Sequence, residues 1–257
     1  MIHYKTAEEI ELLRVSNLLV SKALAEVAKK IAPGVTTLEL DKVAEEFIRD
    51  NHAIPGFLGY KGYPRTLCTS VNQQVVHGIP SGYVLKEGDI VSVDCGVLFQ
   101  GYYGDSAYTF AVGEIPERVR LLLKTTREAL YKGIENALEG KRIGDISNAV
   151  QEHCEQEKFT VVREMVGHGI GKGMHEAPEV PNYGKRGYGP RLQSGMVICI
   201  EPMINMGKKD ITQDADGWTI QTADRLPSAH YEHCVSIGKT KADILSSFEF
   251  IEAVYKN

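Results

Sequence analysis

Five residues of this sequence have side chains that are typical ligands of divalent metal ions: Asp94, Asp105, His168, Glu201 and Glu232. Four carboxylates and one imidazole form an oxygen-rich donor set, which suits two first-row cations bridged by shared carboxylates. The same set disfavours a tetrahedral structural zinc site. Two cations roughly 3.5–4 Å apart commonly activate a water between them, so the chemistry that this set predicts is metal-assisted hydrolysis.

The setting of two carboxylates indicates a buried site. Asp94 and Asp105 lie in β-rich runs, residues 90–99 and 102–112, which Gln100-Gly101 would join as a hairpin. A turn of this hairpin centred near Phe99 and Gln100 predicts Asp94 roughly opposite Asp105, and directly opposed residues point to the same face of a sheet. A single Asp in a strand is usually solvated, but apolar neighbours surround both of these. Two buried carboxylates side by side repel each other unless a cation lies between them.

The other three candidate ligands are poorly explained by packing alone. Glu201 ends an apolar run of strand character. Strand alternation would place Glu232 on one face, with Tyr231 and His233 on the other. His168 lies between two glycines, which allow close backbone approach to a site, although a lone histidine in such a setting is more often a loop residue.

Four amphipathic helices are expected to position these residues. Two begin at capping boxes, in which a Thr and a Glu three residues later bond to each other's backbone N–H groups. The first helix is expected to begin at Thr6 with Glu9 and to end before Pro33-Gly34, and the second to begin at Thr36 with Glu39. The third is expected to have Pro116 in its first turn and to end near Gly140, and the fourth to include residues 146–150.

The elements recur as two copies of one plan. Gly34 and Gly140 match at an offset of 106, and residues 85–94 match residues 192–201 at an offset of 107. Each strand copy begins Leu-x-x-Gly and ends in a carboxylate, which chance similarity of amphipathic helices does not explain.

We therefore expect a single domain, residues 1–257, built from duplicated halves of about residues 6–112 and 113–250. A pseudo-two-fold arrangement would bring the ends of the two matching strands to one central place. The expected fold class is α+β, with a strongly curved, mainly antiparallel sheet and four helices covering one face.

Composition narrows the class of protein. The chain has 257 residues, is 43% hydrophobic and carries a formal charge of −5 from 29 basic and 34 acidic residues. This mild negative charge argues against nucleic-acid binding. The five scattered cysteines, never spaced as C-x-x-C, argue against a disulfide framework and favour a reducing compartment. No signal peptide or membrane span is readable, so we expect a cytoplasmic protein with no membrane partner.

Six short motifs resemble those of the type I methionine aminopeptidases of peptidase family M24, in their short, bacterial-like form. Each is weak alone, but the ordered set is specific and covers nearly the whole chain. The resemblance implies the pita-bread fold and a metallo-exopeptidase that removes N-terminal methionine from nascent polypeptides when the second residue is small. The motifs are Gly59-Tyr-Lys-Gly-Tyr-Pro64, Val76-His-Gly-Ile-Pro80, Asp94 with Asp105, Gly167-His-Gly-Ile-Gly171, Ile200-Glu-Pro-Met203 and Tyr231-Glu-His233.

The resemblance also implies a role for each metal ligand. Asp94 would chelate one metal, Asp105 and Glu232 would bridge both, and His168 and Glu201 would hold the other. The cofactor would be two divalent ions, with Mn, Fe, Co and Zn all open. A water bridging the metals would be the nucleophile, and Glu201 would accept its proton.

Further residues gain substrate roles in the same way. His77 and His175 resemble histidines that contact the scissile amide and the tetrahedral intermediate, where imidazoles can donate hydrogen bonds and protonate a leaving amine. An apolar, polarisable slot for the methionine thioether would be lined by Tyr60, Tyr63, Cys68, His77 and Trp218. Three residues depart from the pattern of many relatives and affect the shape of this slot: Phe57, Lys61 and Met174.

Rival interpretations share the same fold. Prolidases and aminopeptidases P normally carry a large extra N-terminal domain, for which this chain has no room. A type II methionine aminopeptidase would have an insertion between His168 and Glu201, and a non-enzymatic, ribosome-binding relative would lose ligands that are all present here. We expect a monomer acting on N-terminal Met peptides and nascent chains, with ribosome association left open.

Overall fold

The structure, a computed structural model, describes residues 1–255. Within these residues no helix is both long and apolar enough to cross a lipid bilayer. The helices are α1 (Ala7–Ala28), α2 (Thr37–Asp50), the short 3₁₀ helix η1 (Tyr60–Gly62), α3 (Glu117–Ile134), α4 (Ile143–Gln156) and α5 (Glu249–Val254). The strands are β1 (Ile54–Pro55), β2 (Leu67–Val71), β3 (Gln74–Val76), β4 (Ile90–Phe99), β5 (Tyr102–Ala111), β6 (Thr160–Val161), β7 (Gly167–Gly169), β8 (Glu176–Val180), β9 (Val197–Ile200), β10 (Met203–Asn205), β11 (Ile211–Gln213), β12 (Ile220–Thr222), β13 (Ser228–His230), β14 (His233–Ser236) and β15 (Asp243–Ile244).

The helix starts follow the sequence pattern. Both capping boxes are present, because the backbone N–H of Glu9 donates to Thr6 and that of Glu39 donates to Thr36, while each glutamate accepts from the N–H of its threonine. These contacts satisfy N–H groups that a helix start leaves without partners. The prediction of Pro116 in the first turn of α3 is wrong by one position, because Pro116 is the N-cap residue.

The helix ends differ from the prediction for a tertiary reason. α1 stops at Ala28 and α3 at Ile134, each several residues earlier than expected. Beyond α1, the N–H of Gly34 donates to the carbonyl of Leu85; beyond α3, the N–H of Gly140 donates to that of Leu192. These backbone groups bond to distant segments instead of continuing the helix. The terminal helix α5 was not predicted.

The same hydrogen bond therefore occurs at matching positions of the two sequence copies. It is 2.8 Å long at Gly34 and 2.9 Å long at Gly140, and both glycines have positive φ, at 94° and 91°. Gly88 and Gly195 match as well, at φ values of 91° and 88°. The duplication stays a prediction, and these paired conformations support it.

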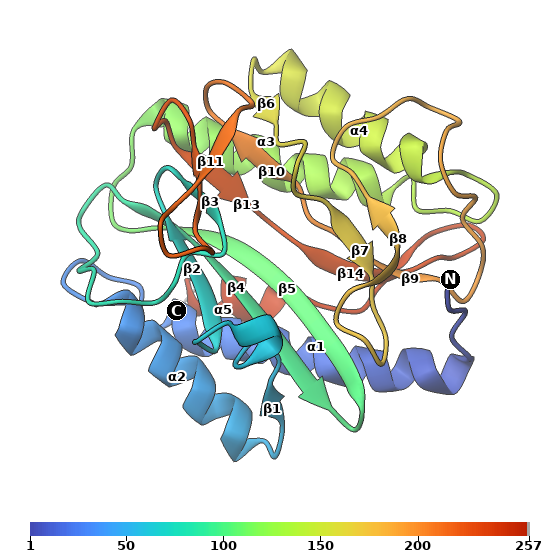
Figure 1. The fold of residues 1–257 in the computed structure, drawn as a ribbon, viewed down its shortest axis with the longest axis horizontal. Helices are drawn as coiled ribbons and strands as arrows, with labels where there is room; N and C mark the ends of the chain where they lie inside the picture. The colour runs from blue at the N-terminus through green and yellow to red at the C-terminus, as the bar shows by residue number, and fades with distance from the viewer. Residues whose placement is uncertain (256–257) are drawn as a thin grey trace.

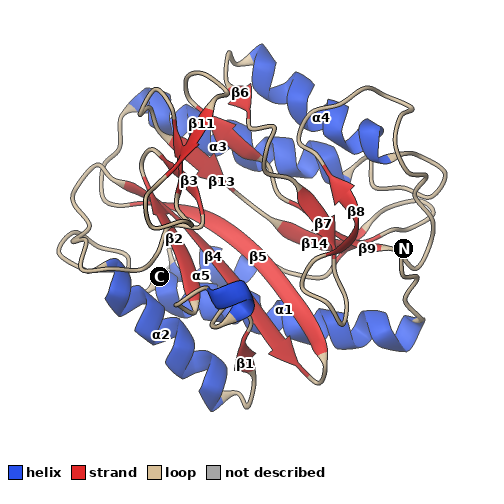
Figure 2. Ribbon diagram, viewed as in Figure 1, coloured by secondary structure: helices blue, strands red, loops and turns tan. Residues whose placement is uncertain are grey.

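All strand pairings between named strands are antiparallel. β4 pairs with β1, β2 and β5; a second group runs β13-β10-β6, a third β11-β12-β3 and a fourth β15-β14-β9-β7-β8. Figure 1 shows the long β4–β5 hairpin crossing the molecule, with α1 and α2 on one side of the view and α3 and α4 on the other. Figure 2 shows the strands lying between these two helix pairs.

The predicted hairpin is present, but its register differs from the expectation. Asp94 pairs with Ala107 and Gly96 pairs with Asp105, so the two aspartates are diagonal neighbours rather than opposite ones. The turn is centred between Gln100 and Gly101, one residue later than we expected. Residues two apart on a strand share a face, so both carboxylates still point the same way.

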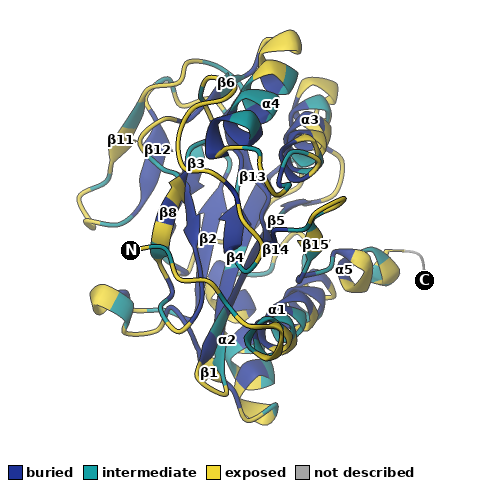
Figure 3. Ribbon diagram, turned by 90° about the vertical axis from the view of Figure 1, so that its right-hand side faces the viewer, coloured by how far each residue is buried: buried dark blue, intermediate teal, exposed yellow. Residues whose placement is uncertain are grey.

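The core lies between the helices and the strands. Figure 3 shows the α-helices together on one side of the strand layer, as predicted, with buried residues concentrated where the two layers meet. One large cluster joins both halves, since it includes Leu24, Leu40 and Val93 together with Ile146 and Ile198. The two halves therefore share one core.

α1 approaches the β5 backbone closely at Gly104. A Cβ built at Gly104 would lie 2.5 Å from the backbone carbon of Ser16 and 2.6 Å from the nitrogen of Asn17. The side-chain oxygen of Asn17 accepts a 3.2 Å hydrogen bond from the N–H of Asp105. The missing side chain at Gly104 thus allows the contact that fixes the backbone of a candidate ligand.

Gly104→Ala should therefore destabilise the protein by about 1–3 kcal/mol, because the added methyl group pushes α1 away from β5. Urea unfolding followed by circular dichroism measures this change. Gly82→Ala is the matched control, since nothing lies within 4 Å of a Cβ built there. Equal unfolding midpoints for the two variants would show that the close approach is not needed.

Candidate metal centre and adjoining cavity

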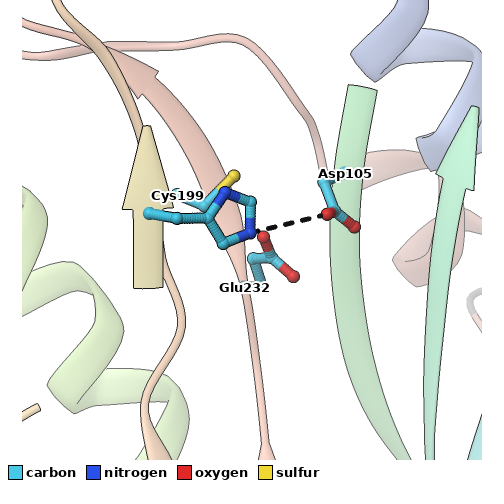
Figure 4. A group of neighbouring side chains, drawn as sticks. Asp105, Cys199 and Glu232 are labelled. Atoms are coloured by element: carbon cyan, nitrogen blue, oxygen red, sulfur yellow. Dashed lines mark ion pairs between the residues drawn. The ribbon is translucent and has the colours of Figure 1, made fainter. Parts of the chain in front are cut away.

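The five candidate ligands converge from separate segments of the chain. Nε2 of His168 is 3.9 Å from Oδ2 of Asp105 and 3.6 Å from Oε1 of Glu201. Figure 4 shows Asp105 and Glu232 in this group, with a dashed line marking the ion pair that ends on Asp105. Asp94 lies on β4, Asp105 on β5 and His168 on β7, Glu201 follows β9, and Glu232 lies between β13 and β14.

Several oxygen atoms of this group are buried without hydrogen-bond partners. Oδ1 of Asp94, Oδ1 of Asp105 and Oε1 of Glu232 have none among the described residues. The exposed fraction is 4% for Asp105 and 2% for Glu232. Buried polar atoms are almost always bonded, because an unsatisfied one costs free energy, so these atoms call for a partner that protein groups do not supply.

The charges of the group point to the same kind of partner. Burial, with the other carboxylates nearby, raises the pKa of Asp105, Glu201 and Glu232 well above their usual values, and burial raises the pKa of Asp94 to about 7. Among the described residues, histidines are the only basic side chains within 4.0 Å of these carboxylates. Divalent cations fit this oxygen-rich, uncompensated cluster.

His168 is oriented by its backbone neighbours. Its Nδ1–H donates to the carbonyl of Gly169 at 2.8 Å, which leaves Nε2 free to act as a lone-pair donor toward the carboxylates. A Cβ at Gly167 would lie 2.4 Å from the carbonyl of Cys199, and one at Gly169 would lie 2.4 Å from that of Ala177. The flanking glycines therefore let β7 fit between its neighbours, and His168 is a strand residue rather than a loop residue.

Glu232 is fixed from the β5 side. Its N–H donates to the carbonyl of Ala107 at 2.9 Å, and its carbonyl accepts from the hydroxyl of Ser106 at 2.7 Å. Tyr231 and His233 both contact the ring of Phe248, on the side away from the carboxylates. The predicted alternation at this segment is confirmed.

A cavity of about 290 Å³ opens onto the carboxylate group. All the predicted slot residues line it, together with the candidate ligands. Tyr63 and Trp218 meet edge to face, with ring centroids 5.1 Å apart. Trp218 is half-buried in this wall, so it is not a plain core residue.

The two predicted catalytic histidines occupy different depths of the cavity. His77 has a φ of 60°, a strained value for a residue other than glycine, and burial lowers its pKa. The ring of His175 lies 4.2 Å from that of His168, between centroids. Desolvation by the cavity walls, followed by His168, Lys61 and His77, lowers the pKa of His175. Both imidazoles are therefore neutral near pH 7 and each can donate one N–H.

Two of the residues that depart from the family pattern pack with residues of the slot, and of these two Phe57 lines the cavity. Phe57 and Met174 belong to one buried cluster with Tyr63 and Cys68. A Cβ at Gly96 would lie 2.5 Å from Cε1 of Phe57 and 2.9 Å from Cε of Met174. The bulk of Phe57 is accommodated because Gly96 has no side chain.

Two residues of the centre were not predicted. Sγ of Cys199 lies within 4.8 Å of the ligand atoms of the metal group, and Nε2 of His230 lies 3.8 Å from Oε2 of Glu201 without a hydrogen-bond partner. Cys199 precedes Glu201 by two residues, and His230 precedes Glu232 by two. Strand periodicity places such pairs on one face, so it was a usable signal. The cavity lining that no motif contains is Glu164, Met165 and Val166, whereas Val76 and Met203 lie in two of the motifs but were given no role.

Comparisons with known proteins identify relatives of this chain. The family model described as "Metallopeptidase family M24" matches residues 11–239 of this chain. The chain is 49% identical to the methionine aminopeptidase of Clostridium perfringens over 246 residues, which is 96% of this chain and 99% of that one. It is 47% identical to methionine aminopeptidase 1 of Bacillus subtilis over 246 residues, again 96% of this chain and 99% of the relative.

Solved structures show the same fold. The methionine aminopeptidase of Thermotoga maritima superposes with a TM-score of 0.94 at 44% identity, covering 96% of this chain and all of that one. The prolidase of Pyrococcus furiosus superposes with a TM-score of 0.75 at 24% identity, covering 96% of this chain and 66% of that one. At this identity the likeness shows the fold alone. The predicted pita-bread fold is confirmed.

The raised carboxyl pKa values predict how metal-free protein responds to pH. The folded state holds protons that the unfolded chain releases above about pH 4. The stability that these groups contribute is present below that pH and is lost as pH rises through the raised values, about 7 for Asp94. The melting temperature of chelator-treated wild-type protein should fall over this range. The melting temperature of Asp94→Asn should fall less, because the asparagine side chain cannot ionise.

Calorimetry of both proteins with and without a divalent cation measures this effect. Added cation should stabilise the wild-type protein more near pH 7 than near pH 5, because metal ligands must be deprotonated. If wild-type stability rose with pH relative to Asp94→Asn in the absence of metal, the carboxylate group would not carry the repulsion described above.

Proposed function

The chain belongs to metallopeptidase family M24 and to its methionine aminopeptidases, and on this premise we propose how its own residues remove an N-terminal methionine. The observation that carries the proposal is that one cavity is lined by both the aromatic slot and the buried carboxylate group. A slot for an apolar side chain beside a hydrolytic centre suits cleavage after one terminal residue.

We propose that the five candidate ligands hold two divalent cations, with Asp105 and Glu232 shared between them. The support is the unpartnered oxygen atoms of both carboxylates and the position of His168 between Asp105 and Glu201. When bound, the cations acidify a water molecule and polarise the scissile carbonyl. Mn, Fe, Co and Zn all suit such ligands, so metal availability decides loading.

Glu201 is the proposed proton acceptor. Its carboxylate lines the cavity and its Oε1 lies 3.6 Å from Nε2 of His168, so it would stand beside the attacking water, where it can take a proton and release it again. His77 contacts the scissile amide, and its imidazole can pass on to the leaving amine the proton that Glu201 releases, taking it up at one ring nitrogen as the other gives its own. His175 donates a hydrogen bond to the oxyanion that forms on the carbonyl.

The slot defines the first residue of the substrate. Tyr60, Tyr63 and Trp218 supply aromatic walls and Cys68 a thiol, which give a polarisable surface for a thioether. The second residue would lie near His77 and His175, beside the carboxylate floor, where space is small. We therefore propose that small second residues are required.

Other aspects of the proposal extend beyond the site. The proposed substrates in the cell are nascent chains, processed by a monomer in the cytoplasm. All five cysteines are unpaired and buried, which fits a reducing compartment. We also propose that the single domain arose from two duplicated halves. The support is the matched backbone conformations of Gly34 with Gly140 and of Gly88 with Gly195.

The ligand roles predict distinct metal losses. Asp105→Ala removes a shared ligand and should cost both cations, whereas His168→Ala should mainly loosen one. Elemental analysis of purified variants measures the metal content. Asp41→Asn is the matched control: it alters a buried carboxylate that accepts from the N–H groups of Thr66 and Leu67, outside the cavity, and should keep both cations. Full metal content in Asp105→Ala would contradict the assignment.

The substrate proposal predicts a ranking of peptides. Met-Gly, Met-Ala and Met-Ser peptides should be cleaved, and Met-Leu, Met-Lys and Met-Trp barely. Leu-Ala peptides should be cleaved slowly, because leucine fills the slot but lacks the thioether, a difference worth roughly 1–3 kcal/mol. The measurement is kcat/KM with metal supplied anaerobically. Efficient release of leucine, or of any residue ahead of proline, would instead indicate a broader aminopeptidase or an aminopeptidase P.

A further inference from the structure

Tyr60 lies at the junction between the methionine slot and His175. Its hydroxyl oxygen is 2.9 Å from Nδ1 of His175, and the two rings stack with centroids 5.3 Å apart and an interplanar angle of 22°. The Tyr60 ring also packs against the buried cluster at the base of the slot. One side chain therefore contacts both the slot and the imidazole.

The backbone holds Tyr60 in place on both sides. Its N–H donates to the carbonyl of Phe57 at 2.9 Å, and its carbonyl accepts from the N–H of Tyr63 at 2.9 Å. The turn closes with a 2.8 Å bond from the N–H of Gly59 to the carbonyl of Tyr63. Gly59 has a φ of 82°, which the absence of a side chain permits. The Tyr60 ring is thus carried by a short turn that several backbone hydrogen bonds hold closed.

The segment that carries His175 is anchored as well, through contacts of Glu176 that do not involve the His175 ring. The carboxylate of the next residue, Glu176, accepts from the N–H of Gly173 at 2.9 Å and pairs with Nζ of Lys5 at 2.7 Å. The Lys5 side chain is only 6% exposed, so this ion pair is protected from solvent. The imidazole itself is exposed at the cavity mouth, and among residues 1–255 its hydrogen bond to Tyr60 is the only one.

A neutral imidazole has two tautomers, and the partner of one nitrogen decides which is present. If the Tyr60 hydroxyl donates to Nδ1 of His175, the ring proton lies on Nε2. If the hydroxyl accepts instead, Nε2 has only a lone pair. An oxyanion needs a donor, so only the first arrangement suits the role of His175.

We propose that Tyr60 is a positioning residue whose hydroxyl donates to Nδ1 of His175 and holds the ring in the tautomer with its proton on Nε2. This inference rests on the proposed function, because it assigns the purpose of the bond to the oxyanion contact. Tyr60 then links recognition of the first residue to the chemistry, since its ring lines the slot while its hydroxyl orients the histidine.

Tyr60→Phe tests the inference because it keeps the ring and removes the hydroxyl alone. The expected result with a Met-Ala peptide is a fall in kcat of about tenfold with KM little changed, since an outer hydrogen bond that orients a functional histidine is worth about 10–100-fold. In a His175→Ala background, Tyr60→Phe should cause no further loss, because the group through which it acts is gone.

Tyr63→Phe is the matched control from the same slot. Its hydroxyl bonds to the carbonyls of Leu67 and Gly78, at 2.9 and 3.0 Å, and has no bond to His175. Any loss caused by Tyr63→Phe should therefore multiply with that of His175→Ala. Unchanged kcat in Tyr60→Phe, or an equal loss in both backgrounds, would overturn the inference.

A second measurement does not depend on turnover. The ¹⁵N resonances of the histidine ring nitrogens in zinc-loaded protein report which nitrogen carries the proton, and the His175→Ala spectrum identifies the signals of His175. Wild-type protein should show the Nε2–H tautomer and Tyr60→Phe a mixture. The same tautomer in both proteins would overturn the inference. Failure of the wild-type protein to cleave Met-Ala peptides would instead overturn the proposed function, whatever the spectra show.

Discussion

The repulsion among four carboxylates brought together inside the protein is the constraint on which the rest of this structure depends. Among the described residues, histidines are the only basic side chains within 4.0 Å of these carboxylates, and several carboxylate oxygen atoms have no hydrogen-bond partner. The four residues are Asp94, Asp105, Glu201 and Glu232. Such a group is costly to bury in a metal-free protein. Divalent cations would offset this cost when bound, so the proposed site of the chemistry is also a place where stability is expected to depend on metal.

The surrounding fold holds these side chains in place by close backbone contacts. Gly104 lets α1 approach β5, which allows Asn17 to bond the backbone of Asp105. Gly167 and Gly169 do the same for β7 between its neighbours. Each contact sets a backbone position rather than a side chain, so the ligands are directed before any cation binds. This is the rigid support that a site with defined geometry requires.

The cavity divides into an acidic floor and an aromatic wall, and Tyr60 connects this wall to His175. Its ring is part of the wall, while its hydroxyl bonds the imidazole of His175 above the floor. Phe57 fits into this wall because Gly96 has no side chain, so the shape of the slot depends on a backbone position of β4 as well as on the aromatic rings.

The sequence alone determined the two helix starts at capping boxes, the hairpin, the fold class and five candidate ligands that line one cavity in the structure. These depend on local rules such as capping boxes, strand alternation and turn residues, or on motifs that keep their order along the chain. The tertiary structure decided where α1 and α3 end, because Gly34 and Gly140 bond to segments far away in the sequence. It also decided the diagonal pairing of Asp94 with Asp105 and the presence of Cys199 and His230 beside the ligands. Those features arise from contacts between distant segments, which no local pattern specifies.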